Sequence, residues 1–277
     1  MRKSPLAYSF LTLLIKYPKL LLIALLLGGL SYTYELFVAR DTMVFQGIPK
    51  ATRDGLQTFT RIFRNDAFMV GYSDIRGNPL WVVYKLSAPK ASQPLKRPEN
   101  FTSDWRNFGV IGTSDYTNSG YDRGHMAPNR AIAQLYGKKA QEETFLMTNI
   151  TPQKPSLNQK LWQRLESLEF EVFTQKFKSV WVYTGPLFNR DVKRLKSSYW
   201  VEIPDAFYKI YVGIQADGNL KTLAFVIPQN AKANTPLEKF IVSIDTVEKQ
   251  SGFDFLHTLE DGIEKELEKQ TQKEGWF

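Results

Sequence analysis

The fold and the chemistry of this chain centre on the stretch Tyr121-Asp122-Arg123-Gly124-His125-Met126-Ala127-Pro128-Asn129, which contains one of only two histidines in the molecule. Turn-forming residues precede it, and Pro128-Asn129 closes it. We therefore expect His125 at the edge between a strand and a loop, where functional sites usually lie. A neutral imidazole with a pKa near 6.5 can take a proton from water at physiological pH.

The residues beside His125 leave two interpretations open. A lone histidine is more often structural than catalytic. Arg123, however, would place a planar, permanently charged guanidinium group next to it. Gly124 would let another backbone or side chain approach closely. Asp122 could orient a neighbouring side chain or pair with Arg123. From these residues alone, both a structural and a catalytic role for His125 remain.

A second polar stretch follows about thirty residues later and contains Asn158 and Glu166. Leucines recur there at helical spacing and predict a helix over 157–170. On one helix, Asn158 and Glu166 lie roughly 12 Å apart along the axis. Asn158 could then bind a cation directly while Glu166 holds the cation's water ligands, an arrangement that suits magnesium. The alternative is that Asn158 caps the helix and Glu166 is a solvated surface residue.

Composition excludes several kinds of site. The chain has no cysteine, which removes disulfides, thiolate zinc sites and cysteine nucleophiles. Its other histidine is His257, which we interpret as structural, so a site built from several histidines is also excluded. Any metal must therefore be an oxygen-ligated ion such as magnesium, manganese or calcium. The net charge of +8 favours polyanions such as nucleic acid or acidic lipid without choosing between them.

Residues 1–40 predict a membrane segment. The apolar run Leu20–Tyr34 is short for a helix crossing a hydrocarbon core of about 30 Å, but residues 36–39 could extend it. No clean cleavage site follows, so we expect an uncleaved signal anchor rather than a cleaved signal peptide. The positive-inside rule places residues 1–19 in the cytosol. A helix buried in the domain is the alternative.

The rest of the chain alternates short apolar runs with turns. Residues 68–72 and 80–86 predict an antiparallel hairpin, and further strands are expected at 179–184, 207–213 and 223–227. Leu56 to Ile62 is weakly helical, and 240–248 is expected to form a helix. The pattern favours an α+β fold with a central antiparallel sheet flanked by helices. We expect a domain over 41–260 and a charged C-terminal tail over 261–277.

The sequence Asp122-Arg123-Gly124-His125 resembles the D-R-G-H signature of the DNA/RNA non-specific endonucleases, the ββα-metal family that includes mitochondrial endonuclease G. The segments 148–153, 157–159 and 162–166 resemble the second signature of that family. Further similarity covers roughly residues 44–258. The resemblance implies a ββα-metal nuclease core and a Mg²⁺-dependent endonuclease that hydrolyses DNA and RNA, with Mn²⁺ as the other candidate ion.

The same resemblance implies a role for each site residue. His125 would be the general base, Asn158 the direct ligand of a hydrated magnesium, and Glu166 the holder of the metal's waters. Arg123 and Arg97 would approach the scissile phosphate. The remaining two positions, Asp122 and Asn149, would support the site.

Position 170 departs from the family pattern. Some members carry an arginine one helical turn after the glutamate, where this chain has Phe170. An arginine from elsewhere, such as Arg164, Arg190 or Arg194, is one substitute. Weaker affinity for phosphate is the other outcome.

The expected partners are DNA and RNA, bound through phosphate contacts, and a membrane, reached through the N-terminal anchor. A homodimer is left open. The catalytic domain is expected on the non-cytosolic side, in a bacterial envelope or a mitochondrial intermembrane space, or secreted if the leader is cleaved. Two alternatives to the nuclease remain: a non-catalytic module that binds nucleic acid or a protein partner, and a phosphodiesterase for small nucleotides.

Overall fold

The computed structural model describes residues 16–53, 55–89, 94–109, 111–189 and 191–277. The chain divides into two compact units, Met1–Thr42 and Met43–Phe277. The division lies two residues beyond the boundary expected from the sequence. The charged segment 261–277 belongs to the second unit instead of forming a separate tail.

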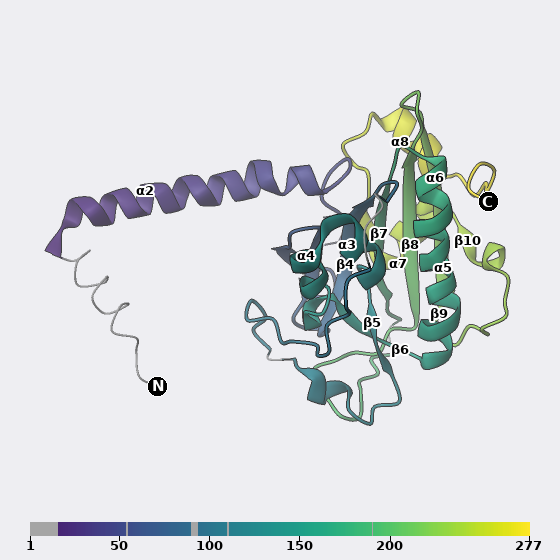
Figure 1. Ribbon diagram of the computed structural model, residues 1–277, viewed down its shortest axis with the longest axis horizontal. Coiled ribbons are helices and arrows are strands. Elements are labelled where there is room, and N and C mark those ends of the chain that lie inside the picture. Colours follow the sequence, from purple (N-terminus) through teal and green to yellow (C-terminus); the bar gives the residue numbers. More distant parts are fainter. Residues whose placement is uncertain (1–15, 54, 90–93, 110, 190) are drawn as a thin grey trace. The chain divides into compact units, whose positions relative to one another are not determined.

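The first unit is helical in its described part. Helix α2 (Pro18–Tyr34) has no buried residue and continues into a π-helical turn, η1 (Glu35–Ala39), and a 3-10 turn, η2 (Asp41–Met43) (Figure 1). The stretch Pro18–Met43 has 26 residues and a mean hydropathy of 1.8, so its length and composition would allow it to cross a membrane. A signal sequence has the same properties. Most of the expected cytosolic leader, residues 1–15, lies outside the described residues.

A seven-stranded antiparallel sheet forms the centre of the second unit among the described residues, with strand order β10-β9-β8-β7-β4-β3-β2. This confirms the expected α+β fold and the hairpin of residues 68–86. In chain order the strands are β2 (Arg61–Arg64), β3 (Phe68–Ser73), β4 (Asn78–Leu86), β7 (Ser179–Leu187), β8 (Ala206–Ile214), β9 (Leu220–Pro228) and β10 (Ile241–Val242).

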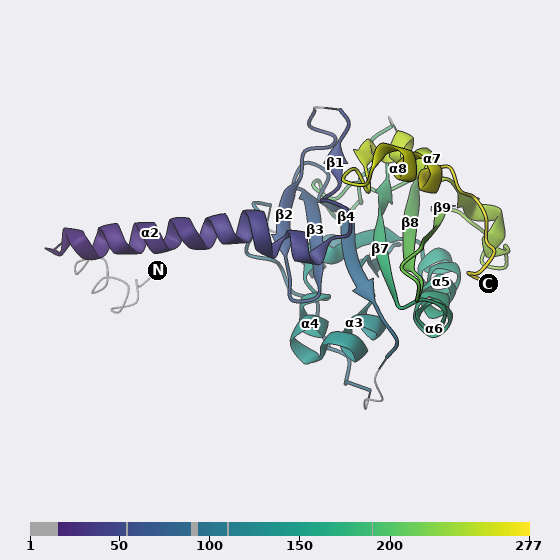
Figure 2. The same cartoon turned by 90° about the horizontal axis from the view of Figure 1, so that it is seen from above.

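Both faces of the sheet are buried, because successive side chains on a strand point to opposite faces. On β4, Val82 and Tyr84 join one hydrophobic cluster, and Trp81 and Val83 join the other. Figure 2 shows helices on both sides of the sheet. One side has α3 (Asn129–Tyr136), α4 (Lys138–Glu143), α5 (Gln163–Leu168) and α6 (Thr174–Lys176); the other has α7 (Ile244–Ser251) and α8 (Asp261–Glu268).

The segment that carries the site is a small hairpin followed by a helix. Strand β5 (Asp122–His125) pairs antiparallel with β6 (Ile150–Gln153). A Cβ atom on Gly124 would lie 2.2 Å from Oε1 of the buried Gln153 side chain, so a larger residue at position 124 would displace that side chain. A continuous helical segment then covers 157–176 through η5 (Leu157–Trp162), α5, η6 (Glu169–Phe173) and α6. This is the ββα unit that the resemblance implies.

Two local expectations were wrong. The stretch Leu56–Ile62, expected to be weakly helical, contains no helix. Residues 56–58 form a turn, and Arg61 and Ile62 belong to β2, which pairs with β3 at the edge of the sheet. Pairing with a neighbour outweighs a weak local helix preference. The helix expected over 240–248 begins only at Ile244, where Ser243 Oγ accepts a 3.2 Å hydrogen bond from the Thr246 N–H.

The remaining elements connect these layers. Strand β1 (Lys50–Ala51) pairs with β11 (Phe253–Asp254), and short 3-10 turns lie at η3 (Thr113–Tyr116), η4 (Met147–Asn149) and η7 (Leu237–Phe240). Near the C-terminus, the Trp276 ring packs on Phe173 and Phe177, at centroid distances of 4.9 and 4.4 Å. The end of the chain is therefore part of the core and not a solvated tail.

Candidate active site

A cavity of about 300 Å³ brings together five of the seven residues expected in the site. Its polar wall includes Arg97, Arg123, His125, Asn158 and Glu166. They come from a loop, from β5 and from the helical segment 157–176. Residues as far apart in sequence as Arg97 and Glu166 thus converge on one cavity, as the resemblance implies.

His125 is the last residue of β5 and is half-buried, with part of its surface in the cavity. Its ring packs against Phe101 and Phe145, at centroid distances of 5.3 and 4.9 Å. Nε2 is buried and has no hydrogen-bond partner among the described residues. Burial, reinforced by the positive charge of Arg97, lowers the pKa of His125 to about 3. The imidazole is therefore neutral at physiological pH, the form that accepts a proton.

Asn149 lies outside the cavity and is fully buried beneath it. Its Oδ1 accepts a hydrogen bond from the Ala127 N–H at 2.9 Å, and its Nδ2 donates to the carbonyls of Ala127 and Thr144 at 3.1 and 2.9 Å. The Asn149 carbonyl accepts a further bond from the Met126 N–H at 3.0 Å. Asn149 thus fixes the backbone that immediately follows His125.

Asn158 is held by Asp122 across the site. Its Nδ2 donates to Asp122 Oδ2 at 2.9 Å, and Gln159 Nε2 donates to the same oxygen at 2.9 Å. Because the amide nitrogen faces the carboxylate, Oδ1 of Asn158 is left as a ligand for a cation. Asn158 is not a helix cap: the helix begins at Pro155, and the backbone N–H of Asn158 already donates to the Lys154 carbonyl at 2.9 Å.

Glu166 lines the cavity one helical turn after Trp162 and is only half-exposed. Burial raises its pKa to about 7, against the opposing positive charge of Lys209, while the negative charge of Glu169 raises it further. The interpretation of Glu166 as an ordinary solvated surface residue therefore does not hold.

Behind Glu166 lies a fully buried network that the sequence did not predict. Lys209 Nζ pairs with Glu169 Oε2 at 2.7 Å. The hydroxyls of Tyr84 and Tyr211 each donate to the Glu169 carboxylate at 2.9 Å, and Lys209 also donates to the Tyr84 oxygen at 3.1 Å. The network ties the helical segment 157–176, which we call the catalytic helix because it carries Asn158 and Glu166, to β4 and β8. One sign of this network is present in the sequence, which is the position of the charged residue Lys209 in the middle of the apolar strand 206–214.

Arg123 and Arg97 place positive charge at the cavity. Arg123 Nη2 donates to the Thr113 carbonyl at 2.7 Å, and its guanidinium lies 5.7 Å from the Phe101 ring centre. The Arg97 guanidinium lies 5.3 Å from the centre of the Phe145 ring. Both aromatic rings also flank His125, so the arginines and the imidazole share one apolar support.

A further arginine, Arg130 on α3, lines the cavity and was missed from the sequence. Its guanidinium lies 5.6 Å from the centre of the Phe170 ring, and its Nη1 pairs with Glu171 at 2.7 Å. Of the substitutes expected from sequence, Arg164 and Arg194 do not line the cavity, and Arg190 lies outside the described residues. The only sign of Arg130 in the sequence was its position five residues after His125, at the start of the next helix.

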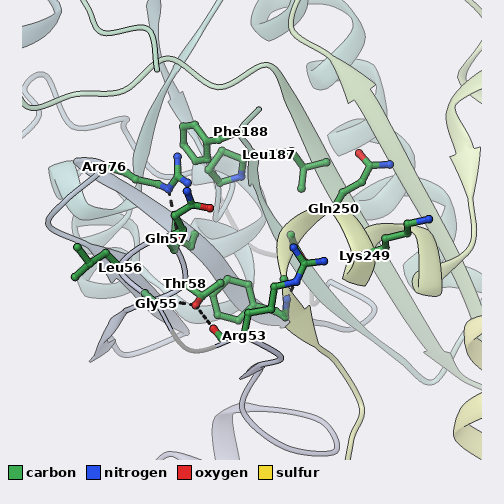
Figure 3. Close-up of a pocket in the computed structure, with 15 residues that line it drawn as sticks. Arg53, Gly55, Leu56, Gln57, Thr58, Arg76, Leu187, Phe188, Lys249 and Gln250 are labelled. Atoms are coloured by element: carbon green, nitrogen blue, oxygen red, sulfur yellow. Dashed lines mark hydrogen bonds between the residues drawn. The ribbon is translucent and has the colours of Figure 1, made fainter. Parts of the chain in front are cut away.

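A larger cavity of about 470 Å³ lies elsewhere, between the loop 55–58 and the end of α7 (Figure 3). Among the described residues, its wall contains Arg53, Arg76 and Lys249 but no histidine, aspartate or glutamate. Arg76 is already paired with Glu202 at 2.7 Å. The described lining of this cavity offers no histidine or carboxylate as a proton acceptor. The smaller cavity contains both His125 and Glu166 and is therefore the candidate active site.

Comparison with known proteins agrees with this geometry. Residues 50–262 match the model of the DNA/RNA non-specific endonuclease family. The chain is 31% identical over 216 residues to human mitochondrial endonuclease G, covering 73% of this chain and 71% of that protein. It is 30% identical over 213 residues to a nuclease of Nostoc sp., with coverages of 73% and 75%. A crystal structure of the EndoG/EndoGI complex superposes with a TM-score of 0.66 at 25% identity, covering 78% of this chain and 89% of that one.

Proposed function

Because this chain belongs to the family of DNA/RNA non-specific endonucleases, we propose that it is a magnesium-dependent endonuclease that hydrolyses phosphodiester bonds of DNA and RNA. One observation carries this proposal: a neutral histidine, an oriented amide oxygen and three arginines line the same cavity. Each of these groups has a task in phosphodiester hydrolysis. The arginines would also serve binding alone, but binding would not need the histidine or the oriented amide oxygen.

In this proposal His125 is the general base. Its neutral imidazole accepts a proton from a water molecule, and the water oxygen forms a new bond to phosphorus. The bond between phosphorus and the 3′ oxygen breaks, which gives a 5′-phosphate and a 3′-hydroxyl. A positioned base of this kind contributes about 10²- to 10⁴-fold in rate. Asn149 acts indirectly, by holding the backbone that positions the ring.

The residues present fit a hydrated magnesium ion. Asn158 Oδ1 would bind the ion directly, and the Glu166 carboxylate would hold its water ligands. The ion would supply a positive charge that stabilises the leaving 3′ oxygen. Manganese, with similar ligand preferences, is expected to replace magnesium.

Arg97, Arg123 and Arg130 would bind phosphate groups. A guanidinium donates two parallel hydrogen bonds to phosphate oxygens and keeps its charge at any working pH. Hydrogen bonds from these guanidinium groups to phosphate carry no information about the base, so cleavage should depend little on base sequence. Affinity for polymer should then fall steeply as salt rises.

A digestion assay with the full chain in detergent tests this function. Supercoiled plasmid DNA and a structured RNA are incubated with the protein in EDTA, and then with excess Mg²⁺. The proposal predicts no cutting in EDTA and cutting of both substrates after Mg²⁺ is added. A circular plasmid has no ends, so its nicking or linearisation requires endonuclease action. Binding without cutting would favour a non-catalytic module, and turnover of dinucleotides alone would favour a small-nucleotide phosphodiesterase.

We also propose that Pro18–Met43 anchors the nuclease domain in a membrane, with that domain on the non-cytosolic side. Twenty-six helical residues extend about 39 Å, which exceeds a hydrocarbon core of about 30 Å. Lys16 and Lys19 precede most of the apolar stretch, as expected for its cytosolic end. Protease added to sealed membranes should digest the domain only from the non-cytosolic side. Release of the protein by alkaline carbonate would contradict anchoring.

A further inference from the structure

The segment between β7 and β8 presents two adjacent aromatic rings to solvent. Tyr199 and Trp200 are 91% and 63% exposed. A single exposed aromatic residue is common on protein surfaces and needs no explanation. These two, however, are neighbours in a segment that also exposes Lys193, Arg194 and Lys196. Residues 193–203, which we call the basic–aromatic loop, therefore combine ring faces with positive charge.

Backbone hydrogen bonds hold the basic–aromatic loop in one conformation. The Leu195 N–H donates to the Val201 carbonyl at 3.0 Å, and the Ile203 N–H donates to the Lys193 carbonyl at 2.7 Å. A further bond of 3.0 Å joins the Ser198 N–H to the Leu195 carbonyl. Leu195 is buried in the core, so the exposed residues project from an anchored base. A fixed backbone lowers the entropy cost of placing the two rings against a ligand.

Two hydrogen bonds connect the basic–aromatic loop to the candidate active site. Ser197 Oγ donates to the carbonyl of Asp115 in η3 at 2.6 Å. The carbonyl of Thr113, in the same turn, accepts from Arg123 Nη2 at 2.7 Å. Arg123 lines the active-site cavity. The loop is therefore separated from a proposed phosphate-binding arginine only by η3, a turn of four residues.

A third cavity, of about 340 Å³, lies beside the basic–aromatic loop and is lined by Tyr121, Lys154 and Lys193 among others. Tyr121 precedes β5 and Lys154 follows β6, so both strands of the hairpin that carries the site open onto it. Within the described part of the chain, neither lysine forms an ion pair. The Asp205 carboxylate also lines the cavity, but it accepts the Asn189 N–H at 2.8 Å. The two lysines can therefore bind an anion.

We propose that Tyr199 and Trp200, with Lys154 and Lys193, bind unpaired nucleotides of a substrate strand beyond the active site, an inference that rests on the proposed nuclease function. Aromatic rings stack on the face of any base, so they bind without reading the sequence. The lysines would bind the phosphates between these bases. In a duplex the base faces are covered by their neighbours, so only a single strand, a loop or a frayed end can use the rings.

A lipid surface is the alternative partner, because tryptophan, tyrosine and lysine also favour membrane interfaces. Two observations favour nucleic acid. The loop is bonded through η3 to the turn that holds Arg123, and the cavity beside it begins at the hairpin that carries His125. A lipid surface would require neither of these connections, whereas a strand that leaves the active site would meet both.

The test measures binding in EDTA, so that its outcome does not depend on cleavage. The full chain in detergent is titrated by fluorescence anisotropy against three labelled ligands of about 20 units each. They are a single strand of mixed sequence, the corresponding duplex, and a single strand of abasic sugar-phosphate units. Because the abasic strand keeps the phosphates and lacks the bases, it separates stacking from electrostatic attraction.

Tyr199→Ala/Trp200→Ala should weaken binding of the single strand at least about fivefold, as the loss of one stacked base would. Binding of the duplex and of the abasic strand should change little. Tyr199→Phe/Trp200→Phe keeps both rings and should bind the single strand nearly as the parent does. Phe59→Ala, which removes an exposed ring outside the loop, is the matched control and should bind as the parent does.

Lys154→Ala/Lys193→Ala should weaken binding of the single strand and of the abasic strand alike. On a single strand, the slope of log affinity against log salt should fall by about 0.7 for each lysine removed. Equal slopes in this variant and the parent would show that the lysines do not contact phosphate and would overturn their part in the site.

Unchanged single-strand affinity in Tyr199→Ala/Trp200→Ala would overturn the proposal and leave a lipid surface as the partner of the rings. An equal loss with the abasic strand would also overturn it, because stacking requires bases. Tm is measured beside binding, and Tyr199→Ala alone takes the place of the double variant if that does not fold. Plasmid digestion by the parent with Mg²⁺ tests the nuclease function separately. Ring-dependent binding by a parent that cuts nothing would contradict the nuclease function and support the binding site.

Discussion

Asn158 Nδ2 donates a 2.9 Å hydrogen bond to Asp122 Oδ2, which joins the catalytic helix to the strand that ends in His125. The bond has two consequences. It sets the orientation of the amide, so that the oxygen is available to a cation, and it couples the position of Asn158 to β5. Asp122 therefore positions a proposed metal ligand and need not pair with Arg123.

Asp122→Asn should weaken metal use. The new amide can donate as well as accept, so the orientation of Asn158 is no longer fixed. Loss of such a supporting partner typically costs 10- to 100-fold in metal affinity. The Mg²⁺ concentration for half-maximal activity should rise about tenfold, with little change in Tm. Gln159→Ala, which removes the other donor to the same oxygen, is the control and should have a much smaller effect. An unchanged magnesium dependence in Asp122→Asn would contradict this role.

Activity should fall as pH drops through about 7, because of Glu166 and not His125. Burial raises the pKa of Glu166 to about 7, so its carboxylate is protonated below that pH, whereas His125, with a pKa of about 3, stays neutral. A cation favours the ionised carboxylate, so higher Mg²⁺ should move the acid limb of kcat/KM to lower pH. The residual activity of Glu166→Gln should lack this limb. If kcat/KM fell at the same pH at every Mg²⁺ concentration, the group whose protonation causes the fall would not be Glu166.

Lys209→Met should destabilise the domain strongly. It leaves Glu169 buried without its cation, and removal of one partner from a buried pair costs about 3–5 kcal/mol. Tm should fall by roughly 10 °C, and the double variant Lys209→Met/Glu169→Gln should recover a large part of the loss. The control is Lys178→Met, because Lys178 is exposed. Equal Tm values for Lys209→Met and the parent, measured by near-ultraviolet circular dichroism, would show that the network is not stabilising.

Arg130→Ala should weaken binding of polymeric substrates. Arg130 lines the cavity beside Phe170, so its loss should raise KM for DNA and RNA several-fold and reduce the slope of log affinity against log salt by about one. Arg164→Ala is the matched control, because Arg164 lies on the catalytic helix but bonds to the Thr235 carbonyl outside the cavity. Equal effects of the two substitutions would assign Arg130 a general electrostatic role only.

The sequence predicted those parts of the structure that depend on local pattern. Short apolar runs of β-branched and aromatic residues at 80–86 and 179–184 indicated strands, and the leucine spacing of 157–170 indicated the helix that carries Asn158 and Glu166. The short motif around His125 identified the site, because its residue types are unusual together. Strand β2 escaped notice, because its pairing partner β3, rather than its own residues, determines its conformation.

The parts that depend on tertiary contacts were not predictable in this way. The Lys209–Glu169 pair joins residues 40 positions apart. The position of Lys209 in an apolar strand is unusual, but the sequence alone does not identify Glu169 as its partner. Arg130 reaches the cavity only because α3 folds back beside Phe170. The packing of Trp276 against Phe173 likewise depends on how the C-terminal segment folds back onto the domain.

The central claim is that His125 is the general base, and His125→Ala tests it most directly. The matched control is His257→Ala, which removes the only other histidine, whose Nε2 lies 3.0 Å from the Ile48 carbonyl oxygen. Plasmid cleavage is measured under single-turnover conditions with saturating Mg²⁺, beside Tm. His125→Ala should lose at least about 100-fold in rate with Tm little changed, while His257→Ala keeps its activity. Cleavage by folded His125→Ala at the parent's rate would contradict the claim.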